Sequence, residues 1–385
     1  TKWILIIASA GVLCGASINN GLMDIARNGV FHPEFFYAPE VMCIFMSVMV
    51  ANLILLDMFN MIGMPTSTTV SMVFELLGGT VAIALIKSFS GDTPVNFAAL
   101  INTDKAFSMI LGIFLSVAIA FFFGVVVQWL TRLLFTFNYK PRLKWFAGLF
   151  GGIAITAIIY FILIKGLKDS SFMTSENRAW VNANAMQLMF YTFVGSSLLM
   201  QLLHILKVNV LKIVVLVGTF ALALAFAGND LVNFIGVPIA GLEAFTVSKA
   251  AGGNESLLMS ALSEPSSASN TIYIVISGII MVVTLWTSRK AMNVSQTELS
   301  LSSADGGGDQ QFNSSMFSRA LVRAAVNTSH FFDRITPERV KNFVAKRFEW
   351  ADIEHSGAPY DMIRSTVNLT TASLLIALGT SLKLP

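Results

Sequence analysis

Charged side chains are scarce in this sequence. Only 12% of the 385 residues are Asp, Glu, Lys or Arg, whereas soluble domains carry about 25%. Hydrophobic residues make up 55%, and the mean hydropathy is +0.71. This balance excludes an ordinary soluble domain and indicates an all-α polytopic membrane protein. The net charge of only +3 gives no indication of nucleic-acid binding.

Cysteine and histidine are also sparse. Cys14 and Cys43 fall in or beside apolar runs, so we expect no disulfide framework. The four histidines are widely scattered and lack the spacing of metal ligands: His32, His204, His330 and His355. No set of nucleophile, base and oxyanion-stabilising groups indicates an enzyme, and we see no cleavable signal peptide.

Long apolar runs, in contrast, recur along most of the chain. They predict membrane-spanning helices at 3–16, 41–56, about 66–86, 107–130, 145–164, 188–205, 213–227, 272–286 and 366–384. Both ends of the chain fall at apolar runs, so we expect it to belong to a longer protein. Glycines at 148, 151 and 152 favour close packing between helices.

The remaining segment has a different composition. Residues 302–309 form a Gly-rich linker, and charged residues with apolar positions at helical spacing follow it, which predicts surface helices beside the membrane. We therefore divide the chain into four parts: a first group of spans (1–227), a second signature stretch with its following span (228–290), a cytoplasmic hydrophilic segment (291–365) and the start of the last spans (366–385).

The distribution of Lys and Arg predicts the orientation. The loop 132–144 and the long segment 289–364 are basic and should both be cytoplasmic. Two segments on the same side must be separated by an even number of membrane crossings. The number is four only if residues 228–241 enter the membrane without a net crossing.

Residues 226–241 combine features that a membrane helix rarely holds. The apolar run 213–227 leads directly into Gly228-Asn229-Asp230, and an ionisable residue this deep in apolar sequence is costly. Four residues would each weaken a continuous helix: Gly228, Gly236, Pro238 and Gly241. We predict a broken membrane helix whose exposed amides face an anion and whose carboxylate and amide side chains face a cation. The alternative is that Asp230 caps a helix just outside the bilayer.

A second stretch, Gly63-Met64-Pro65-Thr66-Ser67-Thr68-Thr69, precedes the third span. Pro65 favours the start of a helix there, with four hydroxyls in the first turn beyond it. Neutral donors at the positive end of a helix suit an oxyanion that must bind and then leave. The alternative is a simple Ser/Thr cap, which needs only one hydroxyl.

Two further carboxylates fall in or near spans. Glu75 lies inside the third span and is a candidate ligand for a coupling cation or proton. It could equally form a hydrogen bond with a neighbouring helix. Asp57 lies at a span end and is expected to be interfacial.

The two stretches together resemble the signatures of the inorganic phosphate transporter (PiT) family. Gly228-Asn229-Asp230-Leu231-Val232-Asn233 is similar to the family's Gly-(Ala)-Asn-Asp-x-x-Asn, and residues 64–69 are similar to its Pro-x-Ser-Thr-Thr-His. The resemblance implies two inverted repeats with broken or re-entrant helices, each repeat carrying one copy of both motifs. Only half of each pair is visible here, so the other copies are expected before residue 1 and after residue 385.

The resemblance implies a secondary-active inorganic phosphate:cation symporter, an uptake permease of the cell (inner) membrane. Phosphate would be bound by seven residues: Thr66, Ser67, Thr68, Thr69, Gly228, Asn229 and Asn233. The coupling cation, Na+ or H+, would be held by Asp230, Asn229, Asn233 and Glu75. No cofactor or nucleic acid is implied; the partners would be phosphate and the lipid bilayer, and the resemblance leaves room for a homodimer.

Two other functions fit the same residues. The substrate could be another tetrahedral oxyanion, such as sulfate or arsenate. From a different class, the chain could be a non-transporting membrane sensor or assembly subunit that uses residues 319–364.

The sequence departs from the family pattern at two positions. Val70 stands where the family has His, which removes any proton role linked to that His, and Gly228 follows Ala227 where the family has Gly-Ala. A run from Asn20 to Asn28 mimics the first-repeat signature. We interpret it as a chance likeness, because Arg27 interrupts it and it lies in a polar loop.

Overall fold

The computed structural model describes residues 2–18, 29–90, 97–136, 140–163, 174–227, 231–263, 271–301, 316–348 and 361–381. These residues form helices joined by loops, with two isolated β-bridges, Phe31–Ile101 and Tyr37–Leu258. The longer helices, in chain order, are α1 (Lys2–Ile18), α2 (Ala38–Ile62), α3 (Thr68–Ser90), α5 (Thr103–Phe135), α6 (Lys140–Phe161), α8 (Ala185–Ile205), α9 (Val210–Phe226), α10 (Val232–Ala250), α11 (Thr271–Thr287), α12 (Arg289–Leu301), α13 (Met316–Ile335), α14 (Glu338–Phe348) and α15 (Met362–Ser381). Short helices lie between them: η2 (Pro33–Phe35), α4 (Phe97–Leu100), α7 (Ser175–Ala183) and η5 (Ser260–Ser263).

Eight of the nine predicted spans are confirmed as apolar helices in the described part of the chain. Within the described residues, five helices are long and apolar enough to cross a membrane, namely α2, α3, α5, α6 and α8. Three shorter apolar helices, α1, α9 and α11, correspond to further predicted runs. With 33 residues, α5 is about 50 Å long, so it must tilt or extend beyond a hydrocarbon core of about 30 Å.

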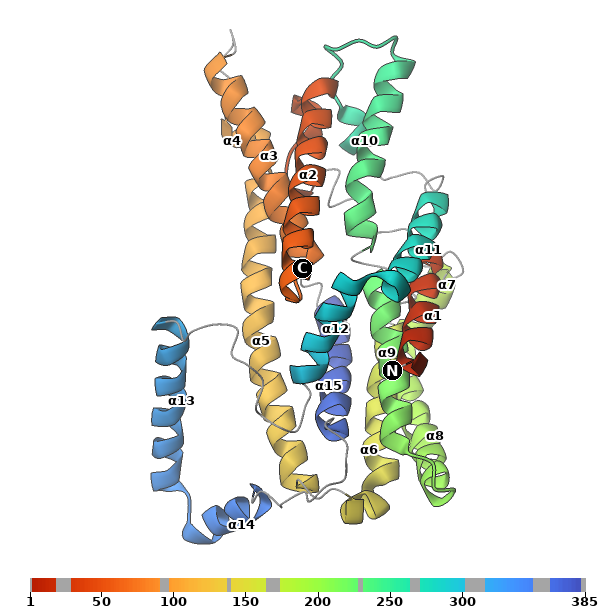
Figure 1. Ribbon diagram of the computed structural model, residues 1–385, viewed down its shortest axis with the longest axis vertical. Helices are drawn as coiled ribbons and strands as arrows, with labels where there is room; N and C mark the ends of the chain where they lie inside the picture. The colour runs from red at the N-terminus through yellow and green to blue at the C-terminus, as the bar shows by residue number, and fades with distance from the viewer. Residues whose placement is uncertain are drawn as a thin grey trace.

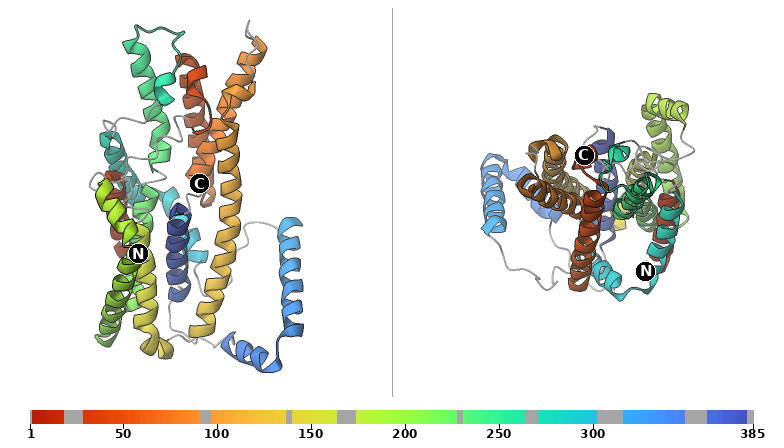
Figure 2. Two further views of the ribbon diagram at one scale, coloured as in Figure 1. Left: turned by 180° about the vertical axis from the view of Figure 1, so that it is seen from behind. Right: turned by 90° about the horizontal axis from the view of Figure 1, so that it is seen from above.

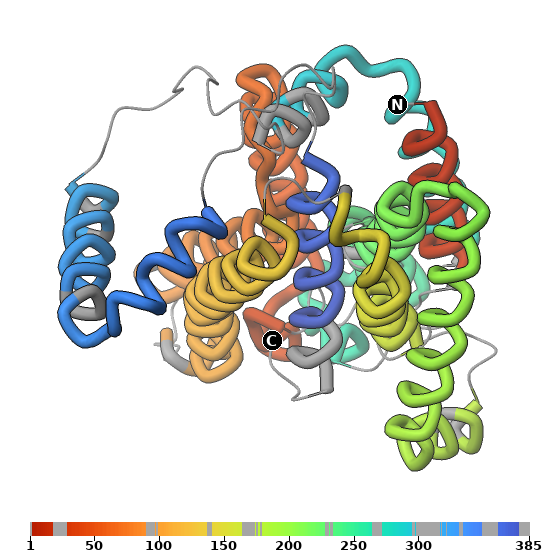
Figure 3. The backbone as a smooth tube through the Cα atoms, turned by 90° about the horizontal axis from the view of Figure 1, so that it is seen from below, coloured from red at the N-terminus to blue at the C-terminus, as the bar shows by residue number. Residues whose placement is uncertain are grey.

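The described helices pack around two large apolar cores (Figure 1), and a smaller cluster joins α1, α10 and α11. One core is built from α2, α3, α10 and the loop segments near Phe31 and Met259. The other is built from α6, α9, α15 and parts of α5 and α8. Seen from behind, the long helix α5 runs past both cores (Figure 2). Seen from below, α15 lies between α5 and α6 (Figure 3). The site residues in α3 and α10 therefore belong to the first core.

Glycines set the distance between α6 and α8, as the sequence predicts. A Cβ atom added to Gly148 would lie 2.8 Å from the Ser197 carbonyl oxygen of α8. One added to Gly151 would lie 2.9 Å from the Met200 side chain. Because these distances are too short for real Cβ atoms, the two backbones approach closely only where the side chain is absent.

Contacts of α5 place the basic segments at one end of the protein. Arg132, near the end of α5, forms a buried ion pair with Asp361 at the start of α15. Trp129 of α5 stacks on Phe348 of α14 with 6.2 Å between ring centroids. The loop after α5 and the end of the hydrophilic segment therefore lie on the same side, as their charges predict (Figure 1). That this side faces the cytoplasm stays a prediction.

The hydrophilic segment contains amphipathic helices, α12, α13 and α14, around the linker whose residues 302–315 lie outside the described part. The last span begins at Met362, before the predicted position 366, so Arg364 belongs to α15. Buried hydroxyls in α15 made this span look weak in the sequence. Thr366, Thr370 and Ser373 donate to carbonyl oxygens four residues earlier at 2.7, 2.7 and 2.8 Å, whereas the Ser365 and Thr371 hydroxyls are buried without a partner in the described structure.

Candidate functional site

The hydroxyl-rich motif lies between α2 and α3. Gly63 ends α2 with φ +74°, a conformation that favours glycine, and its N–H donates to Asn60. The prediction for Pro65 is wrong in register, because α3 begins three residues later, at Thr68. The cap is Ser67, whose Oγ accepts the Val70 N–H at 3.4 Å, so Thr66 and Ser67 precede the helix. Only two of the four hydroxyl residues, Thr68 and Thr69, lie in its first turn.

Thr68 differs from the residue that caps the helix. Its Oγ1 is buried and has no hydrogen-bond partner within the described part of the protein, whereas Thr66 and Ser67 are exposed. A buried hydroxyl normally pairs, so one left open in the first turn of a helix is available to a ligand. The simple-cap interpretation therefore accounts for Ser67 and leaves Thr68 unexplained.

Helix α12 covers the loop that carries this motif. A Cβ at Gly63 would lie 3.3 Å from Thr297 Oγ1 and 3.5 Å from the Asn293 carbonyl oxygen. Asp57, predicted to be interfacial, is more than half exposed and pairs with Lys290 at the start of α12. The hydrophilic segment thus begins in direct contact with the motif loop.

Glu75 lies in α3, seven positions after Thr68 and so two helical turns along the same face. Both of its carboxylate oxygens are buried and have no hydrogen-bond partner among the described residues. The alternative in which Glu75 bonds to a neighbouring helix therefore finds no contact to support it. An unpaired carboxylate inside a span is costly, so its retention favours a functional role.

The signature stretch lies between α9 and α10 in the chain. α9 ends at Phe226 and α10 begins at Val232, while Gly228, Asn229 and Asp230 lie outside the described residues. Asn233 is in the first turn of α10, although its side chain is not described. The run from Asn20 to Asn28 likewise lies outside the described part.

The other predicted helix breakers are part of α10. Gly236, Pro238 and Gly241 all lie within this helix, so none of them breaks it, and whether each weakens it stays a prediction. Membrane helices tolerate Pro where neighbouring groups satisfy the freed carbonyl. Gly241 marks the place where α10 passes α2, because a Cβ there would lie 3.6 Å from the Phe45 ring, an ordinary contact that a side chain could also make.

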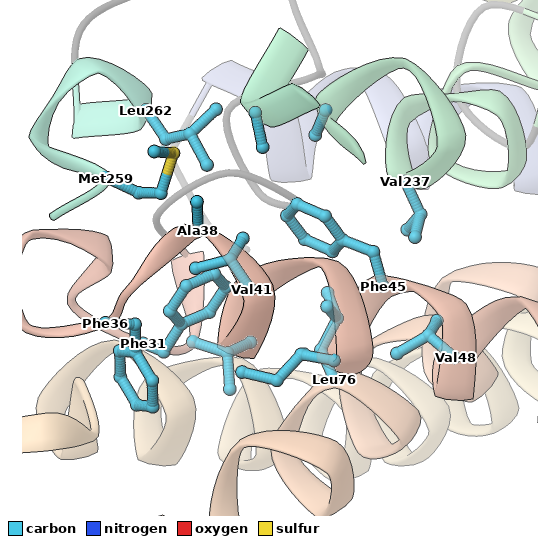
Figure 4. Close-up of a cluster of buried hydrophobic side chains, with 14 of the residues drawn as sticks. Phe31, Phe36, Ala38, Val41, Phe45, Val48, Leu76, Val237, Met259 and Leu262 are labelled. Carbon is cyan, nitrogen blue, oxygen red and sulfur yellow. The ribbon is translucent and has the colours of Figure 1, made fainter. Parts of the chain in front are cut away.

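The packing of three helices brings some of the predicted residues together. In Figure 4, Val237 of α10 projects towards Phe45 and Val48 of α2, with Leu76 of α3 on the other side. Because α10 runs antiparallel to α2, its first turn lies beyond Val48, towards the end of α2. Glu75, one turn before the Gly79 that contacts Ile44, faces α2 near the same level. The hydroxyl motif lies about two turns before Glu75, at the start of α3. It is not adjacent to the first turn of α10.

Sequence reasoning missed one residue in this region. Asn52 of α2 is 2% exposed, and its Oδ1 has no hydrogen-bond partner in the described structure. The signal was present, since Asn52 is the one amide side chain in the apolar run 41–56.

Comparison with known proteins identifies the family. The model of the phosphate transporter family matches residues 1–306, about four-fifths of the chain, and this range contains both motifs. The chain belongs to the phosphate transporter family. Its membership places it among transporters and not among enzymes.

The fold of this phosphate transporter family member is shared with a solved structure. The matching structure, "The sodium-dependent phosphate transporter", has a TM-score of 0.51 and 15% sequence identity. The match covers 99% of this chain and 76% of that chain. At this identity the likeness establishes the fold alone. No curated protein sequence matches the chain at a significant level.

Proposed function

We propose that the protein is a secondary-active symporter that takes up inorganic phosphate together with a cation across the cell membrane. One observation carries the proposal beyond family membership. Within one helical face, Thr68 presents a buried hydroxyl and Glu75 a buried carboxylate, and neither has a partner among the described residues. A hydroxyl at a helix start suits an anion, and a carboxylate inside a span suits a cation.

The phosphate would be bound by Thr66, Ser67, Thr68 and Thr69 at the start of α3 and by Gly228, Asn229 and Asn233 of the signature stretch, two groups that lie at different levels in this structure. Phosphate binding would therefore require the two repeats to move relative to one another. A helix start carries partial positive charge, which favours an oxyanion without fixing it permanently. Neutral donors keep the binding reversible, as transport requires.

The cation would be bound by oxygen atoms near the same helix starts. Asp230, Asn229, Asn233 and Glu75 are the candidates, and Na+ or H+ is the coupling ion. A bound cation offsets the cost of bringing phosphate charge into low dielectric, so each ligand strengthens binding of the other. Rocking of one inverted repeat against the other would then expose the site to either side in turn.

The rest of the chain supports this transport unit. Residues 291–365 would form the cytoplasmic segment beside the lipid bilayer, and the spans on either side would form the transport body. Assembly as a homodimer is compatible with the exposed apolar faces of α5 and α8.

The test is phosphate uptake by the intact protein reconstituted in liposomes. We expect radiolabelled phosphate to accumulate when an inward Na+ or proton gradient is imposed and to stop when the gradient is collapsed. Unlabelled arsenate should compete more strongly than sulfate if the site is built for phosphate, because arsenate, like phosphate, carries protons near neutral pH and sulfate does not. Accumulation that ignores both cation gradients would refute symport, and an absence of uptake would favour the sensor alternative.

A further inference from the structure

Asn52 is the only polar member of the buried stripe of α2. The buried residues of this helix are Ala38, Val41, Ile44, Phe45, Val48 and Asn52. Burying an amide whose oxygen has no partner lowers the stability of the fold. Its neighbours in the sequence, Ala51 and Leu53, are exposed, so position 52 alone continues the buried stripe at this point. An apolar side chain at position 52 would fit that stripe. The position is therefore one where a polar side chain is retained against its cost in stability.

The packing of α10 on α2 shows what Asn52 faces. Phe45 of α2 contacts Gly241 of α10, and Val48 packs with Val237. The two helices run antiparallel, so one further turn along α2 corresponds to one turn back along α10. That step leads from Val48 to Asn52 on α2, and from Val237 to Asn233 on α10. Asn52 is therefore level with the first turn of α10, directly after the signature stretch.

The packing of α3 brings a second group to the same level. Gly79 contacts Ile44 and Ser47 of α2. Lys87 pairs with Glu40 at 2.8 Å, which confirms the antiparallel register. One turn back from Gly79 is Glu75, and the matching turn of α2 covers residues 48–52. The unpaired oxygens of Glu75 and Asn52 thus belong to adjacent levels of neighbouring helices.

The unpaired atoms at this level of the two helices share one chemical character. Glu75 Oε1 and Oε2 and Asn52 Oδ1 are all hydrogen-bond acceptors that lack a donor in the described structure, whereas the other unpaired groups of α3, the Thr68 and Thr80 hydroxyls, lie at other levels of that helix. A group of buried acceptors without donors is satisfied by a positive ligand and not by an anion. Hard monovalent and divalent cations prefer such carboxylate and amide oxygens.

We propose that Asn52 is a ligand of the coupling cation, that this cation is Na+, and that Asn52 binds it through Oδ1 beside the carboxylate of Glu75. This inference rests on the proposed function, since it names the ion and a ligand for the same transport cycle. A carboxylate alone can bind either a proton or Na+. A neutral amide oxygen adds a ligand for Na+ but cannot bind a proton at neutral pH, so Asn52 selects Na+ over H+.

The test is the Na+ dependence of phosphate uptake by the intact protein in liposomes. Asn52→Leu keeps a similar volume and removes the oxygen. We expect the Na+ concentration for half-maximal uptake to rise about tenfold or more, while uptake at saturating Na+ persists. Asn52→Asp retains an oxygen at the same place and should bind Na+ at least as tightly as the wild type. Binding of radioactive Na+ in the absence of phosphate should follow the same order.

Ser47→Ala is the matched control on α2. The Ser47 hydroxyl donates to the Ile44 carbonyl oxygen at 2.7 Å, within its own helix, so its removal should leave the Na+ dependence unchanged. An unaltered Na+ dependence in Asn52→Leu, or a loss of Na+ affinity in Asn52→Asp, would overturn the assignment. If Asn52→Leu does not fold, the Asn52→Asp result decides alone. Wild-type uptake that follows protons and ignores Na+ would refute this inference while leaving symport intact, whereas wild-type protein without uptake would refute the proposed function itself.

Discussion

Replacing Thr68 by Val separates phosphate binding from stability. Val has nearly the same shape as Thr and lacks the hydroxyl. In most buried positions this change leaves a hydrogen-bond partner unsatisfied. The Thr68 Oγ1 has no partner in the described structure, so the change removes no contact within the protein. We therefore expect Thr68→Val to be at least as stable as the wild type.

The expected effect on binding follows from the same unpaired hydroxyl. If it donates to a phosphate oxygen, its loss removes a hydrogen bond to a charged group, which contributes about 1.5–3 kcal/mol. At about 1.4 kcal/mol per factor of ten, the phosphate concentration for half-maximal uptake should rise by about 10- to 100-fold. The Na+ dependence should be retained, because the cation is bound by other groups.

The assay is radiolabelled phosphate uptake by reconstituted intact protein, paired with thermal unfolding of the same samples. Thr80→Val is a matched control, since the Thr80 hydroxyl of α3 is also buried without a described partner but lies further from the motif. We expect Thr80→Val to transport like the wild type. An unchanged phosphate affinity in Thr68→Val would reduce the motif to a structural cap. A fall in stability without a change in affinity would show that the hydroxyl serves the fold.

Three further predictions test the site, the fold and the orientation. Asp230→Asn should give a folded protein, because Asn retains the ability to cap a helix. Uptake should be nearly abolished, because the change removes charge from a low-dielectric site. Wild-type-like uptake with unchanged cation dependence would leave Glu75 as the coupling carboxylate. Arg132→Met should lower the free energy of unfolding by about 3–5 kcal/mol, since it leaves the largely buried Asp361 carboxylate without its counter-charge and with the Arg364 N–H as its donor in the described structure. Thermal unfolding should show that loss and its partial recovery in the double variant Arg132→Met/Asp361→Leu, and an equally stable single variant would contradict the packing of α5 on α15. A protease added to the cytoplasmic face should cut within 300–311, and cleavage only from the opposite face would reverse the orientation.

The sequence alone was enough to predict the membrane class and the family. A run of about 20 apolar residues has few stable states other than a membrane helix, so composition and periodicity predicted where the spans lie. Each of the two motifs is a short contiguous stretch of sequence, so it can be recognised without knowledge of the fold. For that reason the resemblance they carried agrees with the family match over residues 1–306.

Local signals were less reliable for the ends and breaks of helices. Pro65 favours a helix start by its own geometry, yet α3 starts at Thr68, where Ser67 supplies the cap. Pro238 disfavours a helix interior, yet α10 continues through it. Both outcomes depend on neighbouring groups that satisfy or replace backbone hydrogen bonds, and such neighbours are not visible in the local sequence.

Only the tertiary structure could show which polar residues of different helices lie at the same level. Asn52 and Asn233 are far apart in the chain, and nothing in the spacing links them. The antiparallel packing of α2 on α10, set by contacts such as Phe45 with Gly241, places them on the same level. The sequence determined that polar groups lie within the spans, because each one interrupts an apolar run. Which groups become their partners depends on the register between helices. That register is decided by side-chain packing between segments that are distant in the chain.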